Sequence, residues 1–100
     1  MMKTITVDAL HDHFNDYFVV DVREEHEIAA QSIAGTIKYP LSQWHEPFFE
    51  TVKPIVFLCR SGQRSQLAAQ RYMETQPTAV VYNLTGGILA WHAGGYPVLP

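Results

Sequence analysis

The stretch that organises this chain reads Ile55-Val56-Phe57-Leu58-Cys59-Arg60-Ser61-Gly62-Gln63-Arg64-Ser65. Its four apolar residues indicate a buried strand, and the residues from 65 to 73 have the apolar spacing of a helix. The one cysteine of the chain, Cys59, therefore lies in a tight loop between a strand and a helix, with Arg60 and Arg64 beside it. Because cations and helix N-termini favour the thiolate, we predict that Cys59 is substantially ionised and acts as a nucleophile.

The other residues of this loop are suited to holding an anion. Gly62 can adopt backbone angles closed to other residues, which lets successive N–H groups turn inward. Arg60 and Arg64 add charge and forked donors that suit oxyanions, and Ser61 and Ser65 offer hydroxyl groups. We therefore predict that the substrate is bound by Arg60, Ser61, Gly62, Gln63, Arg64 and Ser65.

The length of the loop indicates which anion it holds. Four residues separate Cys59 from Arg64, whereas protein tyrosine phosphatases and arsenate reductases of similar design commonly have one residue more. A phosphoryl group carries three equatorial oxygens and needs the wider bowl. The narrower bowl suits a single extra sulfur atom on the cysteine, so the sequence favours a persulfide over a phosphocysteine.

Working outward from the loop, strand-like and helix-like segments alternate along the chain. Strands are expected at residues 4–7, 18–22, 36–39, 55–58 and 79–82, and helices at 8–14, 24–30, 65–73 and 88–93. Leu41, Trp44 and Phe48 could share one more helix face, which Pro47 would interrupt or restart. This alternation indicates a parallel sheet covered on both faces, with ligands bound beyond the carboxyl ends of its strands, where Cys59 lies.

Composition narrows the class of protein. The chain has 100 residues, which predicts one domain over residues 1–100, and its net charge of −3 argues against a nucleic-acid partner. A single cysteine excludes an internal disulfide, and a lone exposed cysteine suits a reducing compartment. We find no signal peptide and no run of roughly 20 apolar residues, so we expect a cytoplasmic protein, in its simplest form a monomer.

The five histidines do not form a metal-site pattern. His11 and His13 are two residues apart and would lie on different faces of a helix, and the others are isolated. We therefore expect no metal at the site. Large aromatic residues are expected in the core rather than in a ligand platform: Trp44, Phe48, Phe49 and Trp91.

Four segments, in this order, carry a resemblance to a known family: Val20-Asp21-Val22-Arg23 with Glu27, Ile33-Ala34-Gly35-Thr36-Ile37 with Pro40, Cys59 to Ser65, and Leu84-Thr85-Gly86-Gly87 with Trp91. In them the chain resembles the rhodanese-like sulfurtransferases, specifically the single-domain type, over nearly its whole length. One departure is that Gln31 and Ser32 stand where the family usually has glycine and histidine before the isoleucine. We interpret this change as altered local packing.

The resemblance implies an α/β fold of three layers, α/β/α, with a five-stranded parallel sheet. It also implies a double displacement in which Cys59 takes a sulfur from thiosulfate or a persulfide donor and passes it to a thiol, a protein cysteine or another thiophilic acceptor. Arg60 and Arg64 would hold the oxyanion of the donor, and no cofactor is implied. We interpret Asp21, Arg23 and Glu27 as structural support, because ion-pair networks imitate active sites.

Two other functions stay open at this point. One is a non-catalytic module that uses the same fold to dock a protein, which the presence of Cys59 and both arginines disfavours. The other is a small cysteine phosphatase or arsenate reductase, which the loop length disfavours. The sequence does not identify the physiological donor, the acceptor or the pathway.

Overall fold

The central strands of the fold come from short apolar runs that are buried on both faces. The computed structural model describes residues 2–100 and contains one five-stranded parallel sheet in the order β1-β5-β4-β2-β3. The strands are β1 (Lys3–Ile5), β2 (Phe18–Asp21), β3 (Ile37–Lys38), β4 (Ile55–Leu58) and β5 (Val81–Leu84). All four residues of β4 are buried, since β4 lies in the middle of the sheet. The predicted α/β class and parallel sheet are confirmed.

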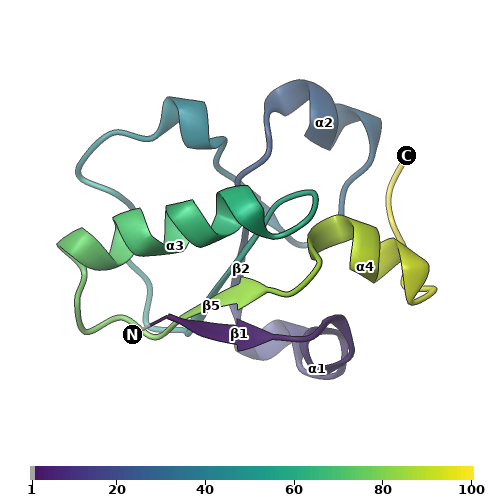
Figure 1. Ribbon diagram of the computed structural model, residues 1–100, viewed down its shortest axis with the longest axis horizontal. Coiled ribbons are helices and arrows are strands. Elements are labelled where there is room, and N and C mark those ends of the chain that lie inside the picture. The colour runs from purple at the N-terminus through teal and green to yellow at the C-terminus, as the bar shows by residue number, and fades with distance from the viewer. Residues whose placement is uncertain (1) are drawn as a thin grey trace.

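Helices follow the strands and cover both faces of the sheet (Figure 1). They are α1 (Val7–Asp12), α2 (Glu25–Ala30), α3 (Gln63–Thr75) and α4 (Gly87–Ala93). On one face Ala68, Ala69 and Tyr72 of α3 pack against Val20 and Phe57 of the sheet. The other face is covered by α1 and α4, through Leu10, Ile88 and Trp91.

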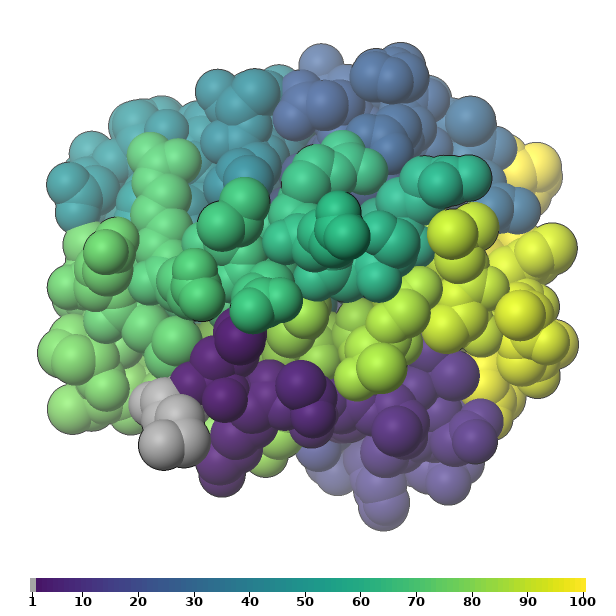
Figure 2. All heavy atoms as spheres, viewed as in Figure 1, coloured from purple at the N-terminus to yellow at the C-terminus, as the bar shows by residue number. Residues whose placement is uncertain are grey.

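Figures 1 and 2 show α4 beyond the N-terminal end of α3, with both helices visible from the same side of the molecule. The loop between β4 and α3 lies beside the start of α4 (Figure 1), where Ile88 N–H donates to the carbonyl oxygen of Cys59 at 2.9 Å. This contact joins the cysteine loop to the first turn of α4.

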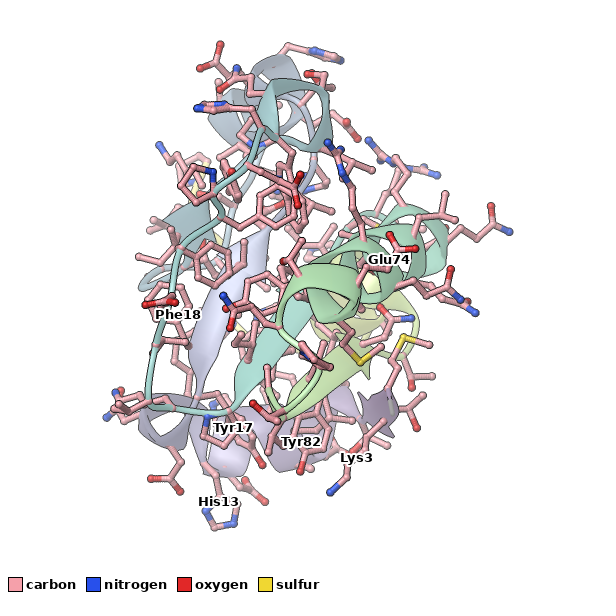
Figure 3. All side chains as sticks on the ribbon, turned by 90° about the vertical axis from the view of Figure 1, so that its left-hand side faces the viewer. Lys3, His13, Tyr17, Phe18, Glu74 and Tyr82 are labelled. Carbon is pink, nitrogen blue, oxygen red and sulfur yellow. The ribbon has the colours of Figure 1, made fainter. Side chains whose placement is uncertain are left out.

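Away from that loop, aromatic rings pack near the edge of the sheet that β1 forms. The register of β1 and β5 sets Lys3 opposite Tyr82, and the Lys3 ammonium lies 5.7 Å from the centre of the Tyr82 ring. The rings of Tyr17 and Tyr82 meet edge to face at 5.6 Å, and Figure 3 shows these three side chains together. Such cation–π and aromatic contacts hold the edge strand in place.

Three sequence expectations about secondary structure were wrong. The strand expected at 79–82 is β5 at 81–84, because parallel pairing sets Ile55 opposite Val81. The strand expected at 4–7 ends at Ile5, since the Thr6 hydroxyl accepts the Ala9 N–H and begins α1. No α-helix forms over residues 41–48, where a 3-10 helix, Leu41–Gln43, is followed by irregular backbone.

Of the aromatic residues after this 3-10 helix, Trp44 and Phe48 are in the core, as expected, whereas Phe49 is only partly buried and packs against that core. Trp44 and Phe48 are 6% and 8% exposed, and Trp91 on the other face is 3% exposed. The Trp44 indole N–H donates to the Tyr39 carbonyl oxygen at 2.7 Å. Burial of large rings, rather than helix periodicity, therefore explains the spacing of apolar residues in this segment.

Candidate active site

Cys59 directly follows β4, at the carboxyl end of the central strand. The residue is only 1% exposed, so the thiol is more enclosed than the exposed cysteine that the sequence suggested. The loop of residues 60–62 folds back over the sulfur, and α4 supports the Cys59 carbonyl group from the other side. The sulfur therefore lies just beneath the loop, almost entirely shielded from solvent.

Two donors point at this sulfur. The Gly62 N–H donates to Cys59 Sγ at 3.1 Å, and the Ser65 hydroxyl oxygen lies 3.3 Å from Sγ. Gly62 reaches this position with a φ of 106°, a backbone conformation that residues other than glycine rarely adopt. Backbone amides arranged in this way form a concave site for an anion, here the sulfur itself.

These contacts favour the thiolate. Burial is the largest single influence and by itself raises the pKa of the Cys59 thiol, because a charge is costly away from water. Hydrogen bonds from the Ser65 side chain and from the backbone of Ser65, Gly62 and Ser61 outweigh it, so the pKa is lowered from its ordinary value. The sequence attributed ionisation to the two arginines and to the helix N-terminus; the contacts that lower the pKa here are hydrogen bonds from the loop amides and from the Ser65 hydroxyl.

A buried asparagine, which the sequence did not single out, supports the loop from below. The Ser65 hydroxyl donates to Asn83 Oδ1 at 2.5 Å, and Asn83 Nδ2 donates to the Gly62 carbonyl oxygen at 2.9 Å. Asn83 is 8% exposed and lies in β5. In the sequence, the only hint of this role is that Asn83 is a polar residue near the end of an otherwise apolar strand.

Arg64 and Glu27 form a two-pronged ion pair. Arg64 Nη1 and Nη2 lie 2.7 and 2.9 Å from the two carboxylate oxygens of Glu27. The hydrogen bond from Arg64 lowers the pKa of Glu27 to about 2, and in turn Glu27 raises the pKa of Arg64. The sequence predicted that Arg64 binds the substrate anion; the structure shows that its guanidinium is already shared with a carboxylate on α2, while it also interacts with the Cys59 charge.

Asp21 and Arg23 form a buried brace at the end of β2. Arg23 Nη2 lies 2.8 Å from Asp21 Oδ2, and their side chains are 5% and 0% exposed. Arg23 also donates to the carbonyl oxygens of Glu27 and Gln31, at 3.4 and 2.7 Å. Gln31 thus binds Arg23 through its backbone carbonyl group, not its side chain. The Asp21–Arg23 pair links β2 to the end of α2.

The remaining loop residues lie at the surface: Arg60, Ser61 and Gln63 are exposed. Below them, Gly87 allows α4 to approach the loop closely. It has a φ of 59°, and a Cβ at this position would overlap the carbonyl oxygens of Cys59 and Arg60. Any side chain at Gly87 would therefore push the loop away from α4.

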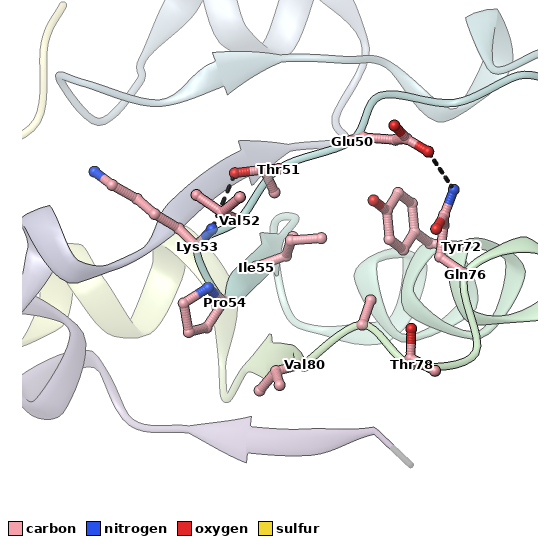
Figure 4. Close-up of a pocket in the computed structure, with 11 residues that line it drawn as sticks. Glu50, Thr51, Val52, Lys53, Pro54, Ile55, Tyr72, Gln76, Thr78 and Val80 are labelled. Carbon is pink, nitrogen blue, oxygen red and sulfur yellow. Dashed lines mark hydrogen bonds between the residues drawn. The ribbon is translucent and has the colours of Figure 1, made fainter.

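One hollow of the surface lies far from Cys59. A hollow of about 480 Å³ lies at the amino ends of β4 and β5, lined by Lys53, Tyr72 and Val80 among others (Figure 4). It is at the opposite end of β4 from Cys59.

Within residues 2–100 there is no cluster of three His, Cys, Asp or Glu side chains able to hold a metal ion. Nor does that part of the chain contain a helix long and apolar enough to cross a membrane.

Known proteins with similar sequences indicate which family this fold and cysteine loop belong to. The family model described as "Rhodanese-like domain" matches residues 6–94. A protein named sulfurtransferase from Allochromatium vinosum is 36% identical over 86 residues, which are 84% of this chain and 79% of that protein. The protein named putative sulfurtransferase YtwF from Bacillus subtilis is 31% identical, over 96% of both chains.

A solved structure shows the same architecture. The crystal structure of a rhodanese-related protein from Thermoplasma volcanium superposes with a TM-score of 0.86 and 32% sequence identity. The match covers 97% of each chain. Family and fold therefore rest on both sequence and structural similarity.

Proposed function

The chain belongs to the rhodanese-like domain family, and we propose that it is a sulfurtransferase that works through a persulfide on Cys59. The donor would be thiosulfate or a persulfide, and the acceptor a thiophile such as a thiol or a protein cysteine. The observation that carries the proposal is the Cys59 sulfur at the base of the six-residue loop, 3.1 Å from the Gly62 amide nitrogen and 3.3 Å from the Ser65 hydroxyl oxygen. Relatives named as sulfurtransferases support the reaction class.

With thiosulfate the reaction has two steps. The Cys59 thiolate attacks the outer sulfur, a sulfur–sulfur bond forms, and the bond to the sulfonate sulfur breaks with its electron pair leaving as sulfite. In the second step an acceptor such as cyanide attacks the outer sulfur of the persulfide, and the Cys59 thiolate leaves. Thiocyanate is released, and each step conserves charge without an oxidant or reductant.

The loop stabilises the charge that moves in these steps. In the persulfide anion the negative charge lies on the outer sulfur, and donors of the loop such as the Gly62 N–H, which points at Cys59 Sγ, would stabilise it. Arg60 is exposed at the rim and is free to attract an anionic donor, whereas Arg64 would act while still bound to Glu27. With four residues between Cys59 and Arg64, the loop is short, which supports transfer of a single sulfur atom over transfer of a phosphoryl group.

Intact-mass measurement tests this proposal. The reduced protein is incubated in parallel with thiosulfate, mercaptopyruvate and glutathione persulfide, and we expect the mass to increase by one sulfur atom with at least one donor. Cys59→Ser, which nearly preserves the shape of the side chain, should abolish both the gain in mass and thiocyanate formation. A gain in mass that persists in this variant would refute the assignment of Cys59.

The same samples separate the two alternatives. A protein-docking module would keep an ordinary thiol and form no persulfide with any donor. A cysteine phosphatase would hydrolyse an aryl phosphate at a useful rate, and that activity would be lost in Cys59→Ser. The shorter loop, with four residues between Cys59 and Arg64, disfavours the phosphatase, and the presence of Cys59 with both Arg60 and Arg64 disfavours the docking module.

A further inference from the structure

The side chain of Asn83 lies beneath the cysteine loop and is oriented by it. Asn83 Nδ2 is 2.9 Å from the Gly62 carbonyl oxygen. A carbonyl oxygen can only accept a hydrogen bond, so the amide nitrogen must face Gly62 and the amide oxygen must face Ser65. The oxygen of Asn83 therefore needs the proton of the Ser65 hydroxyl, 2.5 Å away.

The Ser65 hydroxyl has one proton and two acceptors. Besides Asn83 Oδ1, its oxygen lies 3.3 Å from Cys59 Sγ, and Ser65 is completely buried. When Cys59 is a thiol, S–H donates to the Ser65 oxygen and Ser65 donates to Asn83, so every group has a partner. The Ser65 hydroxyl is among the donors that stabilise the Cys59 thiolate, and while it donates to the sulfur the buried oxygen of Asn83 loses its donor.

We propose that Asn83 is a positioning residue that controls, by competing for the Ser65 proton, how readily the sulfur of Cys59 becomes an anion. An unpaired buried acceptor is unfavourable, so Asn83 opposes the free thiolate. In the persulfide anion the charge lies on the outer sulfur and Sγ is a neutral bridge, which lets the Ser65 proton return to Asn83. Asn83 thus favours the sulfur-loaded protein over the free thiolate, a role that rests on the proposed function.

Charged groups around the sulfur stay the same when Asn83 is changed. On α3, Arg64 interacts with the Cys59 charge and is itself paired with Glu27 of α2. Other charged groups near this end of the sheet are Arg60 in the loop, the Asp21–Arg23 pair at the end of β2, Glu24 before α2 and Lys38 at the end of β3. Differences between variants at Asn83 therefore report on the hydroxyl proton and on the loop contact at Gly62.

Alkylation measures the effect directly. The rate of reaction of the reduced protein with iodoacetamide, followed against pH, gives the pKa of Cys59 in wild type, Asn83→Leu, Ser65→Ala and the double variant. Leucine has nearly the shape of asparagine but no hydrogen-bonding groups. We expect Asn83→Leu to lower the pKa and to raise the alkylation rate below it about fivefold, the size of one net hydrogen bond.

The double variant separates competition from simple support of the loop. Loss of the bond to Gly62 loosens the loop and by itself raises the pKa, and this effect is present whether or not Ser65 is. We therefore expect Asn83→Leu to lower the pKa in the wild-type background but not in Ser65→Ala. A pKa that rises, stays unchanged, or shifts equally in both backgrounds would overturn the proposal.

A second measurement avoids substitution of Asn83. In the wild-type protein the ¹³C resonance of the Asn83 side-chain carbonyl should shift with the ionisation of Cys59, and in Ser65→Ala it should not. A resonance that ignores the titration in the wild-type protein contradicts the competition. Neither readout needs a sulfur donor, so failure of this proposal is distinguishable from failure to form a persulfide in the intact-mass experiment.

Discussion

Removing the negative charge of Glu27 should destabilise the protein in a pH-dependent way. Arg64 lowers the pKa of Glu27 from an ordinary 4.5 to about 2, which at about 1.4 kcal/mol for each tenfold change corresponds to about 3 kcal/mol. The Arg64 side chain is 38% exposed and that of Glu27 20%, so screening by solvent reduces this figure to about 1–2 kcal/mol. We expect Glu27→Gln to lower the free energy of unfolding by that amount near neutral pH.

The direction of the pH dependence follows from the lowered pKa. A carboxylate with a lower pKa in the folded protein stabilises it above the unfolded pKa, and this stabilisation is lost as the pH falls through the folded pKa. The difference between wild type and Glu27→Gln should thus be constant above about pH 5 and should vanish towards about pH 2.

Urea denaturation followed by circular dichroism at a series of pH values measures this difference. Glu25→Gln is the matched control, because Glu25 lies in the first turn of the same helix and is exposed. It should change the free energy of unfolding by less than about 0.5 kcal/mol. An equal effect of both substitutions, or an effect of Glu27→Gln that persists unchanged in acid, would refute the reasoning.

Two further predictions concern residues that shape the loop. Gly87→Ala should destabilise the protein by about 2 kcal/mol or more in thermal unfolding and slow alkylation of Cys59, because a Cβ there overlaps the Cys59 carbonyl oxygen. Gly95→Ala is the control: Gly95 has a φ of 83°, but a Cβ there would have nothing within 4 Å. This substitution should lower the free energy of unfolding by about 1 kcal/mol and leave alkylation of Cys59 unchanged. Arg23→Ala should cost about 3–5 kcal/mol in urea denaturation, since it leaves the buried Asp21 carboxylate unpaired; a loss under about 1 kcal/mol would contradict this.

Much of the fold follows from local sequence patterns. The apolar run at residues 55–58 and the helix after it were predicted, because burial on both faces and helical spacing are visible over a few residues. The segment after Leu41 was predicted poorly. Its large rings pack into the core from irregular backbone, so their spacing imitates a helix that does not form.

The local features of the site were likewise predictable from the sequence. The sequence by itself determined that a cysteine follows the central strand, that Gly62 permits the loop to turn an amide towards it, and that a helix starts immediately afterwards. These features depend on neighbours in the chain, whose steric preferences act over short distances.

Only the tertiary structure decided which distant residues complete the site. Glu27 is 37 residues from Arg64 and pairs with its guanidinium. Asn83 is 18 residues from Ser65 and accepts a hydrogen bond from its hydroxyl. Both contacts depend on where α2 packs and on the register between β4 and β5. Register and packing are set by the collective burial of side chains from the whole chain, so no local pattern around Cys59 reveals which groups control its charge.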